Sequence, residues 1–320
     1  MKETTEKIVV VGTGPMAAEY VKILKHLKRE IRVIGRGSES AMKFNETTGE
    51  KVITGGIDLW LRNNTPATRT AIVAVTENEL GKVTLSLLKA GFTKILVEKP
   101  GGATYKEIYE VAKETKKRKA RVFVAYNRRF NASTEKTKEI IKKDGKVLSF
   151  NFEFTEWSHV IGDLKKAPGV KENWFLHNSS HVIDLAFFLG GVPKKITSYC
   201  AGGLSWHPSA SIFAGAGVAE NGALFSYQAN WQAPGRWGVE VLTPKHRLIL
   251  RPLEHLCVQE IGSVAINNME IDNTLDTQFK PGLYNQVEAF LYNKKANLCP
   301  IEEQSHNLSF YKKIQNRPTA

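Results

Sequence analysis

Cysteine is scarce in this sequence. Among 320 residues there are only three cysteines, Cys200, Cys257 and Cys299, an odd number with wide spacing. A disulfide framework or a zinc site would need even sets or close pairs of cysteines. We therefore expect no disulfides and no metal, and we predict a reducing, cytoplasmic environment.

Long apolar runs are also absent. The first residues, MKETTEKIVVVGTG, place no long apolar segment between the charges and the glycines, so they do not predict a secretory signal. No stretch approaches the ~20 apolar residues of a membrane span. A composition of 42% hydrophobic and 24% charged residues is typical of a soluble globular protein. This length is comfortable for two domains.

Acidic residues are fewer than basic ones, 32 against 45, which gives a formal charge of +13. Nucleic-acid binding is one explanation. Much of the excess, however, falls within 116–119 and 136–143, where helices are expected, without interleaved aromatics or a recognised nucleic-acid motif. Solvated helix faces are the favoured explanation, and neither nucleic acid nor a membrane is an expected partner. The positive field could still attract an anionic ligand, such as a phosphorylated cofactor or a nucleotide-sugar.

Strands and helices alternate through the first ~125 residues, as in a parallel sheet with crossover helices. Ile8–Val11 is a β-branched run, typical of a strand covered on both faces. Further strands are predicted at 31–34, 71–75, 95–97 and 122–125, with helices from 16 onward, over 78–90 and over 105–117. This pattern predicts an α/β fold whose N-terminal domain, 1–125, is a doubly wound Rossmann sheet.

The pattern changes after about residue 130. The stretch 147–155 alternates apolar and polar residues, as in a half-buried strand. More strands are predicted at 196–200, 211–213, 223–231, 237–242, 247–250 and 256–261, and helices at 180–189, 283–292 and 302–313. A run of strands favours an antiparallel sheet. We predict a second domain, 126–320, of α+β type, with an open, mostly antiparallel sheet covered by helices on one face.

A glycine-rich turn follows the first strand and opens the first helix. It reads Gly12-Thr13-Gly14-Pro15-Met16-Ala17. In a dinucleotide site Gly12 permits a tight turn, Gly14 admits a pyrophosphate and Ala17 lets the helix pack on the strand. The helix N-terminus would supply N–H groups to the phosphates. The alternative is a purely structural turn.

The end of the second strand bears on the choice of cofactor. An NAD site usually has an acidic residue there to bind the ribose hydroxyls. This chain instead has Gly35-Arg36-Gly37-Ser38. Arg36 could pair with a 2′-phosphate and Ser38 could donate to it, so NADP(H) is favoured over NAD(H). Alternatively, Arg36 stacks on the adenine or faces solvent.

Polar residues follow two other strands of the first domain. Glu98-Lys99-Pro100 comes directly after 95–97, and Thr76 and Asn78 come after 71–75. Ligands gather at the C-terminal ends of strands in such sheets, so these residues are predicted to face the cofactor. Lys99 could hydrogen-bond a hydroxyl or carbonyl oxygen and stabilise charge during hydride transfer. A plain surface lysine is the alternative.

Taken together, the motifs resemble those of the Gfo/Idh/MocA oxidoreductases. The features that carry the resemblance are GTGPMA at 12–17, EKP at 98–100, YNRRF at 126–130 and HVID at 181–184. The resemblance implies hydride transfer at a carbon of a sugar, cyclitol or related substrate, with Lys99 beside the nicotinamide and the substrate. It also implies that Asn127 and Arg128 line that region, and that the open sheet joins subunits into a homodimer or homotetramer.

The last of these motifs departs from the family pattern. The family usually has Asp, three residues and His on a helix, and here the segment is His177-Asn178-Ser179-Ser180-His181. The spacing predicts both histidines on one helix face. His181 is the candidate acid–base group, while His177 could orient it, bind substrate or relay the proton. Packing at a domain interface is the alternative, and no third ligand lies nearby for a metal.

Other residues are assigned to the substrate side with alternatives left open. Asn178 is predicted to contact substrate, and Trp174 either stacks on a sugar or belongs to the core. Arg128 or Arg129 could instead hold the domains together. Three residues after the strand over 147–155 could border the same cleft, although rim or interface positions are favoured for them: Glu156, Trp157 and His159.

These features predict an NAD(P)-dependent oxidoreductase, with NADP(H) preferred. It would transfer a hydride between nicotinamide and a hydroxyl or ketone of a sugar, cyclitol or nucleotide-sugar. The alternative is a catalytically silent protein that uses the same fold to sense a dinucleotide, as a galactose-regulon co-repressor does. Fold by itself does not decide between them.

Overall fold

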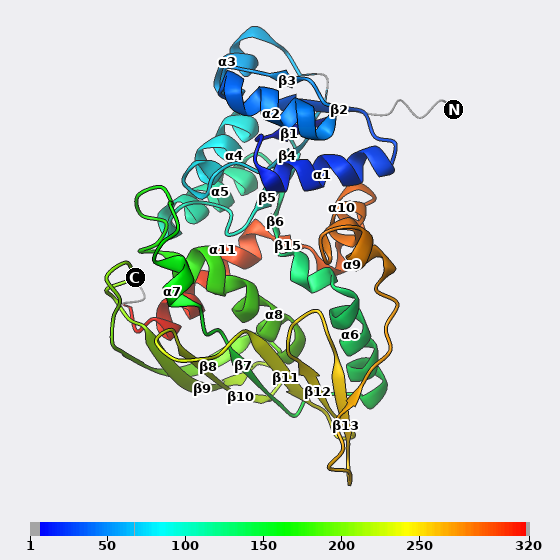
Figure 1. The fold of residues 1–320 in the computed structure, drawn as a ribbon, viewed down its shortest axis with the longest axis vertical. Helices are drawn as coiled ribbons and strands as arrows, with labels where there is room; N and C mark the ends of the chain where they lie inside the picture. The colour runs from blue at the N-terminus through cyan, green and yellow to red at the C-terminus, as the bar shows by residue number, and fades with distance from the viewer. Residues whose placement is uncertain (1–6, 67, 318–320) are drawn as a thin grey trace. The chain divides into compact units, whose positions relative to one another are not determined.

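The structure is a computed structural model that describes residues 7–66 and 68–317. Its contacts divide the chain into two compact units, one of 1–126 with 283–305 and one of 127–282 with 306–320. The sequence predicted a single boundary after residue 125. The structure adds that residues 283–305 return to the first unit. Figure 1 traces the elements of both units along the chain.

The first unit is built on a seven-stranded sheet in the order β15-β6-β5-β4-β1-β2-β3. Strands β1 to β6 are parallel to one another, and β15 pairs with β6 in the antiparallel sense. Their bounds are β1 Ile8–Val11, β2 Ile31–Ile34, β3 Val52–Ile53, β4 Thr70–Val73, β5 Lys94–Glu98, β6 Arg121–Ala125 and β15 Cys299–Pro300. The strand order reverses at β1, which places the topological switch point between β1 and β4.

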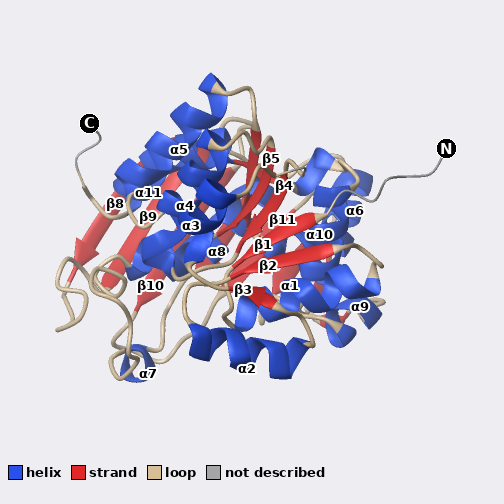
Figure 2. Ribbon diagram, turned by 90° about the horizontal axis from the view of Figure 1, so that it is seen from above, coloured by secondary structure: helices blue, strands red, loops and turns tan. Residues whose placement is uncertain are grey.

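Helices lie on both sides of this sheet (Figure 2). One group contains α1 Pro15–His26, which packs against α2 Ser38–Thr48 and α10 Leu283–Leu291. The other group contains α3 Gly56–Asn63, α4 Leu80–Lys89 and α5 Tyr105–Lys117, in which α4 packs against both of its neighbours. Because both faces are covered, β1 and β4 are fully buried, and all their residues except Thr70 are apolar. The predicted doubly wound Rossmann sheet is confirmed.

The second unit holds an eight-stranded sheet in the order β14-β13-β12-β11-β7-β10-β9-β8. The bounds are β7 Ser149–Glu153, β8 Pro193–Ala201, β9 Ile212–Ala219, β10 Leu224–Asn230, β11 Gly238–Leu242, β12 His246–Leu250, β13 Cys257–Glu260 and β14 Asn267–Asn268. Every neighbouring pair is antiparallel except β7 and β10. The prediction of a mostly antiparallel sheet is confirmed.

One face of this sheet is apolar and covered. Strand β7 alternates strictly, so that Phe150, Phe152 and, beyond its end, Phe154 are buried while the residues between them are partly exposed. Helix α8, Ser180–Gly190, packs on β7 and β11. A Cβ atom at Gly190 would lie 2.4 Å from the Phe150 ring, so glycine is required where the helix ends on the sheet.

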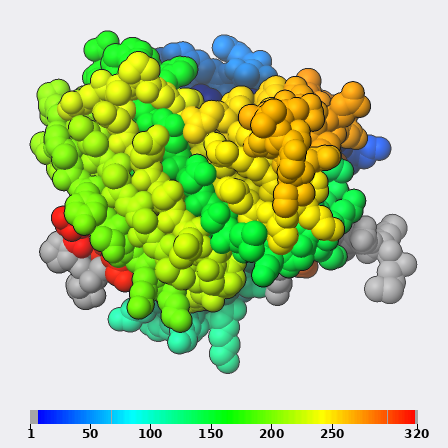
Figure 3. Space-filling view, turned by 90° about the horizontal axis from the view of Figure 1, so that it is seen from below, coloured from blue at the N-terminus to red at the C-terminus, as the bar shows by residue number. Residues whose placement is uncertain are grey.

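The opposite face of the sheet is exposed. On β10 the buried Phe225 and Tyr227 alternate with the exposed Leu224, Ser226 and Gln228. In Figure 3 the green residues of β7 run between the lime strands of β8 to β10 and the yellow strands of β11 and β12, which matches the strand order. This is the open sheet face that the sequence predicted.

The remaining helices of the second unit are α6 Ala132–Asp144, the short α7 Ser158–Ile161 and α9 Thr274–Gln278, while α11 Ile301–Ile314 begins in the first unit and continues into the second. In the part of the chain that the structure describes, no helix combines the length and apolar character that a membrane crossing requires. The lysine-rich runs fall in and just after α5 and α6, and Lys116, Lys117, Lys142 and Lys143 are exposed. Solvated helix faces therefore account for them.

Candidate functional site

The glycine turn after β1 has the geometry that a dinucleotide requires. Gly12 has φ +128°, and a Cβ atom there would lie 2.1 Å from the Ala74 carbonyl oxygen. Only glycine fits this position. A Cβ atom at Gly14 would instead meet no described heavy atom within 4 Å, so the backbone is open to a ligand. Pro15 occupies the first turn of α1, and no described side chain caps the helix N–H groups. The turn therefore fits a pyrophosphate.

The parallel sheet collects the predicted cofactor residues at one edge. Gly12 follows β1, Arg36 and Ser38 follow β2, Thr76 and Asn78 follow β4, and Glu98 ends β5. Because these strands are parallel and in register, their C-terminal ends share one edge. Thr13 and Met16 lie in the same glycine turn and the first turn of α1. The structure thus brings together the predicted contacts that belong to the first unit.

Arg36 is exposed and has an acidic neighbour. One of its terminal nitrogens lies 3.6 Å from the Glu79 carboxylate, which also pairs with Lys82 at 3.5 Å. Asn78 donates to the other side of the same carboxylate at 3.4 Å. Glu79 therefore supplies an acid near the end of β2, although no acid lies there in sequence. The pattern at 35–38 contained no signal for it.

The Glu98-Lys99-Pro100 segment is fixed from two directions. The Tyr20 hydroxyl on α1 donates to Glu98 at 2.7 Å, and its pKa is raised well above the usual value by burial and by the Glu98 charge. From α11, the Gln304 amide donates to the Pro100 carbonyl at 3.1 Å and to the Tyr126 hydroxyl at 2.9 Å. Lys99 therefore follows a strand end that is held on both sides, with a cis peptide bond between Lys99 and Pro100.

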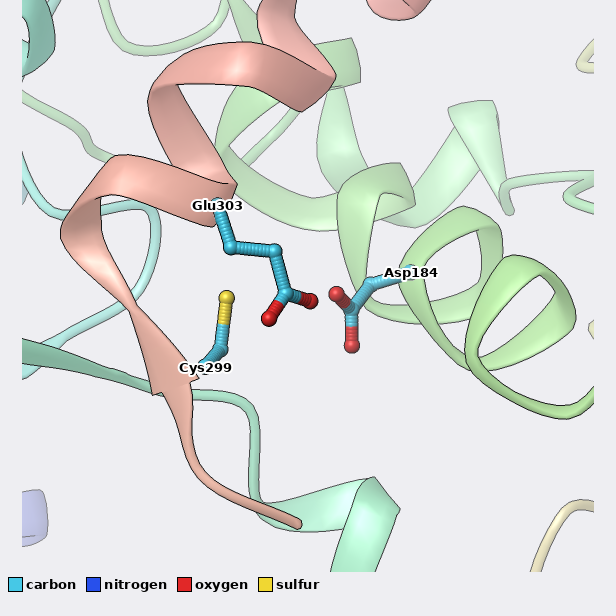
Figure 4. Close-up of side chains that lie close together, drawn as sticks. All are labelled: Asp184, Cys299 and Glu303. Carbon is cyan, nitrogen blue, oxygen red and sulfur yellow. The ribbon is translucent and has the colours of Figure 1, made fainter. Parts of the chain in front are cut away.

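Gln304 comes from the segment of the first unit that follows β15. Figure 4 shows this segment running from Cys299 into the first turn of α11, which carries Glu303. Cys299 pairs with Val124 in the sheet. Predicted as part of the substrate domain, this returning strand and helix turn instead support the loop that bears Lys99.

In the second unit the histidine segment contains a π-helical turn. Phe175–Ser179 is π-helical and continues directly into α8. His177 lies in the π turn and His181 in the first turn of α8, and both are buried. The sequence predicted a regular helix with the two histidines on one face, and the structure has a π turn at His177 instead. Such turns are frequent at functional sites.

Glu156 is the polar centre beneath this turn. Its side chain is 1% exposed, although it was expected at a rim. The Asn178 amide donates to both carboxylate oxygens, at 3.1 and 3.0 Å, and the Ser179 hydroxyl donates at 2.8 Å. Burial raises the pKa of Glu156 to about 7, although the hydrogen bonds from Ser179 and Asn178 and the Arg236 charge oppose that rise. Asn178, predicted to contact substrate, is thus bound to Glu156.

Arginine and tryptophan side chains stack next to Glu156. The Arg236 guanidinium lies 4.7 Å from the ring centres of both Trp157 and Trp237, and Arg128 lies 4.8 Å from Trp237. The Trp237 ring centre is in turn 6.1 Å from that of His181. We call Trp157, Arg236, Trp237 and Arg128 the Arg–Trp stack. Neither Arg236 nor Trp237 was singled out from the sequence.

The other predicted residues have structural partners. Arg129 makes a buried bidentate ion pair with Asp184, at 2.8 and 2.6 Å, and Figure 4 shows the Asp184 side chain on α8. Asn127, predicted to contact the cofactor, donates to the Pro281 carbonyl at 2.8 Å. Trp174 is buried edge-on against Trp206, as in a core. His159 is exposed on α7.

The comparisons with known proteins agree with this geometry. Residues 6–126 match the model of the Gfo/Idh/MocA oxidoreductase family, described as an NAD-binding Rossmann fold. Residues 6–126 therefore correspond to the NAD-binding Rossmann domain that this family model describes. The resemblance inferred from the motifs is confirmed. No curated protein matches the sequence closely enough to be counted as a relative.

Solved structures share the fold over nearly the whole chain. UDP-N-acetylglucosamine 3-dehydrogenase from Acidithiobacillus ferrooxidans is 12% identical, with TM-score 0.74 and coverage of 97% of this chain and 96% of that one. The WlbA dehydrogenase from Bordetella pertussis, in complex with NADH and UDP-GlcNAcA, is 15% identical, with TM-score 0.71 and coverage of 97% and 95%. Levoglucosan dehydrogenase, in complex with NADH and L-sorbose, is 16% identical, with TM-score 0.76 and coverage of 97% and 95%.

Proposed function

We propose that this protein is an NAD(P)-dependent dehydrogenase or reductase. Its substrate would be a sugar, cyclitol or nucleotide-sugar, and a hydride would pass between nicotinamide and the carbon of a hydroxyl or ketone. The observation that carries the proposal is the position of Lys99. It follows β5 at the edge where the glycine turn fits a pyrophosphate, in a segment fixed by Tyr20 and Gln304. Solved dehydrogenases of the same fold act on nucleotide-sugars and sugars.

The proposed roles follow from the chemistry of each side chain. A bound nicotinamide would accept or supply the hydride. The Lys99 ammonium would hydrogen-bond the substrate oxygen and stabilise the charge that develops on it. His181 would hold or release the hydroxyl proton, which is a role suited to an imidazole near neutral pH. His177 would orient His181, contact substrate or pass the proton onward. No metal takes part.

For the cofactor we propose that NADP(H) is preferred and NAD(H) is also accepted. Arg36 is exposed at the end of β2, and a guanidinium fits a 2′-phosphate well. Ser38 is the first residue of α2, where it could donate to the same phosphate. The Glu79 carboxylate on Arg36 opposes this preference, because a phosphate would have to share the guanidinium with it.

Fluorescence titration of the purified chain with NADPH and, separately, NADH tests the proposal. We expect both to bind and NADPH to bind more tightly. Failure to bind either, in folded protein freed of carried-over cofactor, would refute the oxidoreductase assignment. Equal or tighter binding of NADH would refute only the NADP preference.

A catalytically silent sensor is the second candidate, favoured by the histidine that stands at position 177 instead of the family's aspartate. Both candidates bind the dinucleotide, so turnover separates them. An enzyme should oxidise or reduce at least one sugar or nucleotide-sugar and lose that turnover in Lys99→Ala. A sensor should show none in the wild type and should keep its partner output in the variant.

We also propose that subunits join through the open face of the second-unit sheet, as a homodimer or homotetramer. This face carries the exposed Tyr199, Leu224 and Gln228. Sedimentation analysis of the wild type and of Leu224→Glu tests this, because a charge in an apolar interface should dissociate the oligomer. A cytoplasmic location stays a prediction from the scarcity of cysteine.

A further inference from the structure

The Arg–Trp stack presents a guanidinium group that is held in place without a close acidic partner. Arg236 lies over the rings of both Trp157 and Trp237, within cation–π distance of each. The indole N–H of Trp157 donates to the Gly235 carbonyl at 3.1 Å, which fixes that ring to the loop that carries Arg236. Packing on the two indole rings therefore contributes to the orientation of the guanidinium, beside a long ion pair with Glu156 at 3.9 Å.

Among the described residues, Glu156 provides the only carboxylate within 4 Å of Arg236, at 3.9 Å. A charge-assisted hydrogen bond would measure about 2.7–2.9 Å. Glu156 instead accepts three shorter hydrogen bonds from Asn178 and Ser179. The N–H donors of Arg236 thus have no hydrogen-bonded acceptor among the described residues, and 45% of the side chain is exposed.

The position of this guanidinium relates it to the proposed chemistry. Trp237 contacts both Arg236 and His181, so one side chain separates the guanidinium from the proposed acid–base group. Arg128 lies on Trp237 as well and adds a second positive charge. A planar guanidinium with outward N–H donors matches the two oxygens of a carboxylate or a phosphate.

We propose that Arg236, supported by Arg128 on Trp237, binds an anionic group of the substrate, either a sugar carboxylate or the diphosphate of a nucleotide-sugar. The inference rests on the proposed function and narrows its substrate class to acidic or nucleotide-linked sugars. Burial of Glu156 supports it, because a pKa of about 7 leaves this neighbour only partly charged at neutral pH and weakens its competition for Arg236.

Four probes separate the two sources of the anion. Methyl glucuronide carries the carboxylate, UDP-glucose carries the diphosphate, UDP-glucuronate carries both, and methyl glucoside carries neither. Calorimetric titration of the full chain measures the affinity of each. We expect at least one anionic probe to bind about tenfold or more tightly than methyl glucoside, as a charge-assisted contact provides. The affinities for UDP-glucose and for methyl glucuronide are then compared, which shows whether the site prefers the diphosphate or the carboxylate.

Arg236→Gln should abolish this preference, and Arg236→Lys should retain part of it through charge alone. Arg247→Gln is the matched control, because Arg247 is also 45% exposed but is already paired with Glu240 on the neighbouring strand. Far-UV circular dichroism and the melting temperature check that each variant is folded. If Arg236→Gln does not fold, Arg236→Lys and Trp157→Leu supply the test, since both loosen the stack.

Equal affinity for charged and neutral probes would overturn the proposal, and so would binding of none of the four. Equal losses in Arg236→Gln and Arg247→Gln would overturn it too, because they would indicate only an effect of net charge. NADH and NADPH are titrated into the same samples. If the wild type binds neither NADH nor NADPH, the proposed function is refuted. If the wild type binds a cofactor but shows no preference for the anionic probes, only the proposed anion subsite is refuted.

Discussion

The two units differ in how their candidate residues come together. In the first unit every predicted contact follows a strand of one parallel sheet, so the sheet itself aligns Gly12, Arg36 and Lys99 at one edge. In the second unit the important groups come from a strand end, a π turn and a distant loop, and they meet through side-chain packing around Glu156 and Trp237. The regular geometry of a parallel sheet positions the residues of the first site, whereas individual side-chain contacts position those of the second.

Sequence motifs are therefore more reliable in the first unit than in the second. A motif that depends on the order of strands can be interpreted from one sequence, because parallel strands always end on the same edge. A cluster that depends on which loop packs against which turn leaves no local pattern. Substitutions in the first unit should therefore have the effects that its sequence motifs predict. Substitutions in the second unit should reveal residue roles that no sequence motif predicts.

The largest effect is expected at Lys99. Lys99→Ala should lower turnover about 100- to 1000-fold, because it removes a donor aimed at developing charge. NADH affinity should stay within about twofold, since the glycine turn and helix α1 are untouched. Lys106→Ala, at an exposed position in α5, is the control. Unchanged turnover in Lys99→Ala would show that the lysine at the end of β5 is not catalytic.

Alanine substitutions at Gly12 and Gly14 in the glycine turn should have different effects. Gly12→Ala should destabilise the fold by about 1–3 kcal/mol or more, because φ is +128° and the new Cβ would meet the Ala74 carbonyl. Gly14→Ala has φ −88° and open space, so it should cost no more than about 1 kcal/mol of folding free energy. It should still weaken NADH binding about tenfold or more, because the methyl group blocks the pyrophosphate.

Urea unfolding and cofactor titration of the two glycine variants together give the answer. If Gly14→Ala binds NADH like the wild type, the turn is structural rather than a phosphate site. If Gly12→Ala is as stable as the wild type, the close approach to Ala74 is not a constraint.

In the second unit, the buried Glu156 is expected to make the stability of the protein depend on pH. Its pKa is raised from 4.5 to about 7, so the folded protein binds a proton that the unfolded chain has lost. Stability should therefore fall as pH rises from about 4.5 to about 7, by at most about 3 kcal/mol, and then level off. In Glu156→Gln this part of the pH dependence should vanish.

Urea unfolding of the wild type and of Glu156→Gln at pH 5, 6, 7 and 8 measures the effect of Glu156. Glu153→Gln serves as the control, because Glu153 ends β7, three residues before Glu156, but pairs with Arg251 near the surface. Parallel stability curves for the wild type and Glu156→Gln would show that the buried carboxyl does not titrate in this range.

The smallest effect is expected at Glu79. Glu79→Gln should raise NADPH affinity about two- to fivefold and leave NADH affinity unchanged, because it frees Arg36 and removes a like charge from the 2′-phosphate. Glu30→Gln, which removes an exposed ion pair with Lys7 at the other end of β2, should change neither. Equal gains for NADPH and NADH would mean that Arg36 does not bind the phosphate.

Most of the fold could be predicted because its hydrophobic patterns are regular. The strands at 8–11 and 31–34 and the helix at 105–117 were placed correctly to the residue. The short elements between 38 and 63 were missed, because α2 buries only Ala41 and Phe44 and shows little periodicity. The π turn at 175–179 was also missed, since nothing in its residue types distinguishes it from an α-helix.

The candidate site divides in the same way. Glu98, Lys99 and the glycine turn were predictable because their strand positions define their edge of the sheet. The contributions of Glu79 and Gln304 could not be predicted, because each comes from a segment distant in sequence. Glu79 pairs with Arg36, and Gln304 donates to the Pro100 carbonyl. The contacts of Trp237 could not be predicted for the same reason.

The class of fold, the dinucleotide turn and the lysine at the end of β5 follow from the order of the residues, because hydrophobic periodicity and strand order are local properties of the chain. Three other features arise from the packing of distant segments: the burial of Glu156 next to the histidine segment, the contact of Arg236 with two indole rings, and the return of 283–305 to the first unit. These outcomes depend on which side chains exclude water together. That is a property of the packed chain, and no spacing along the chain encodes it.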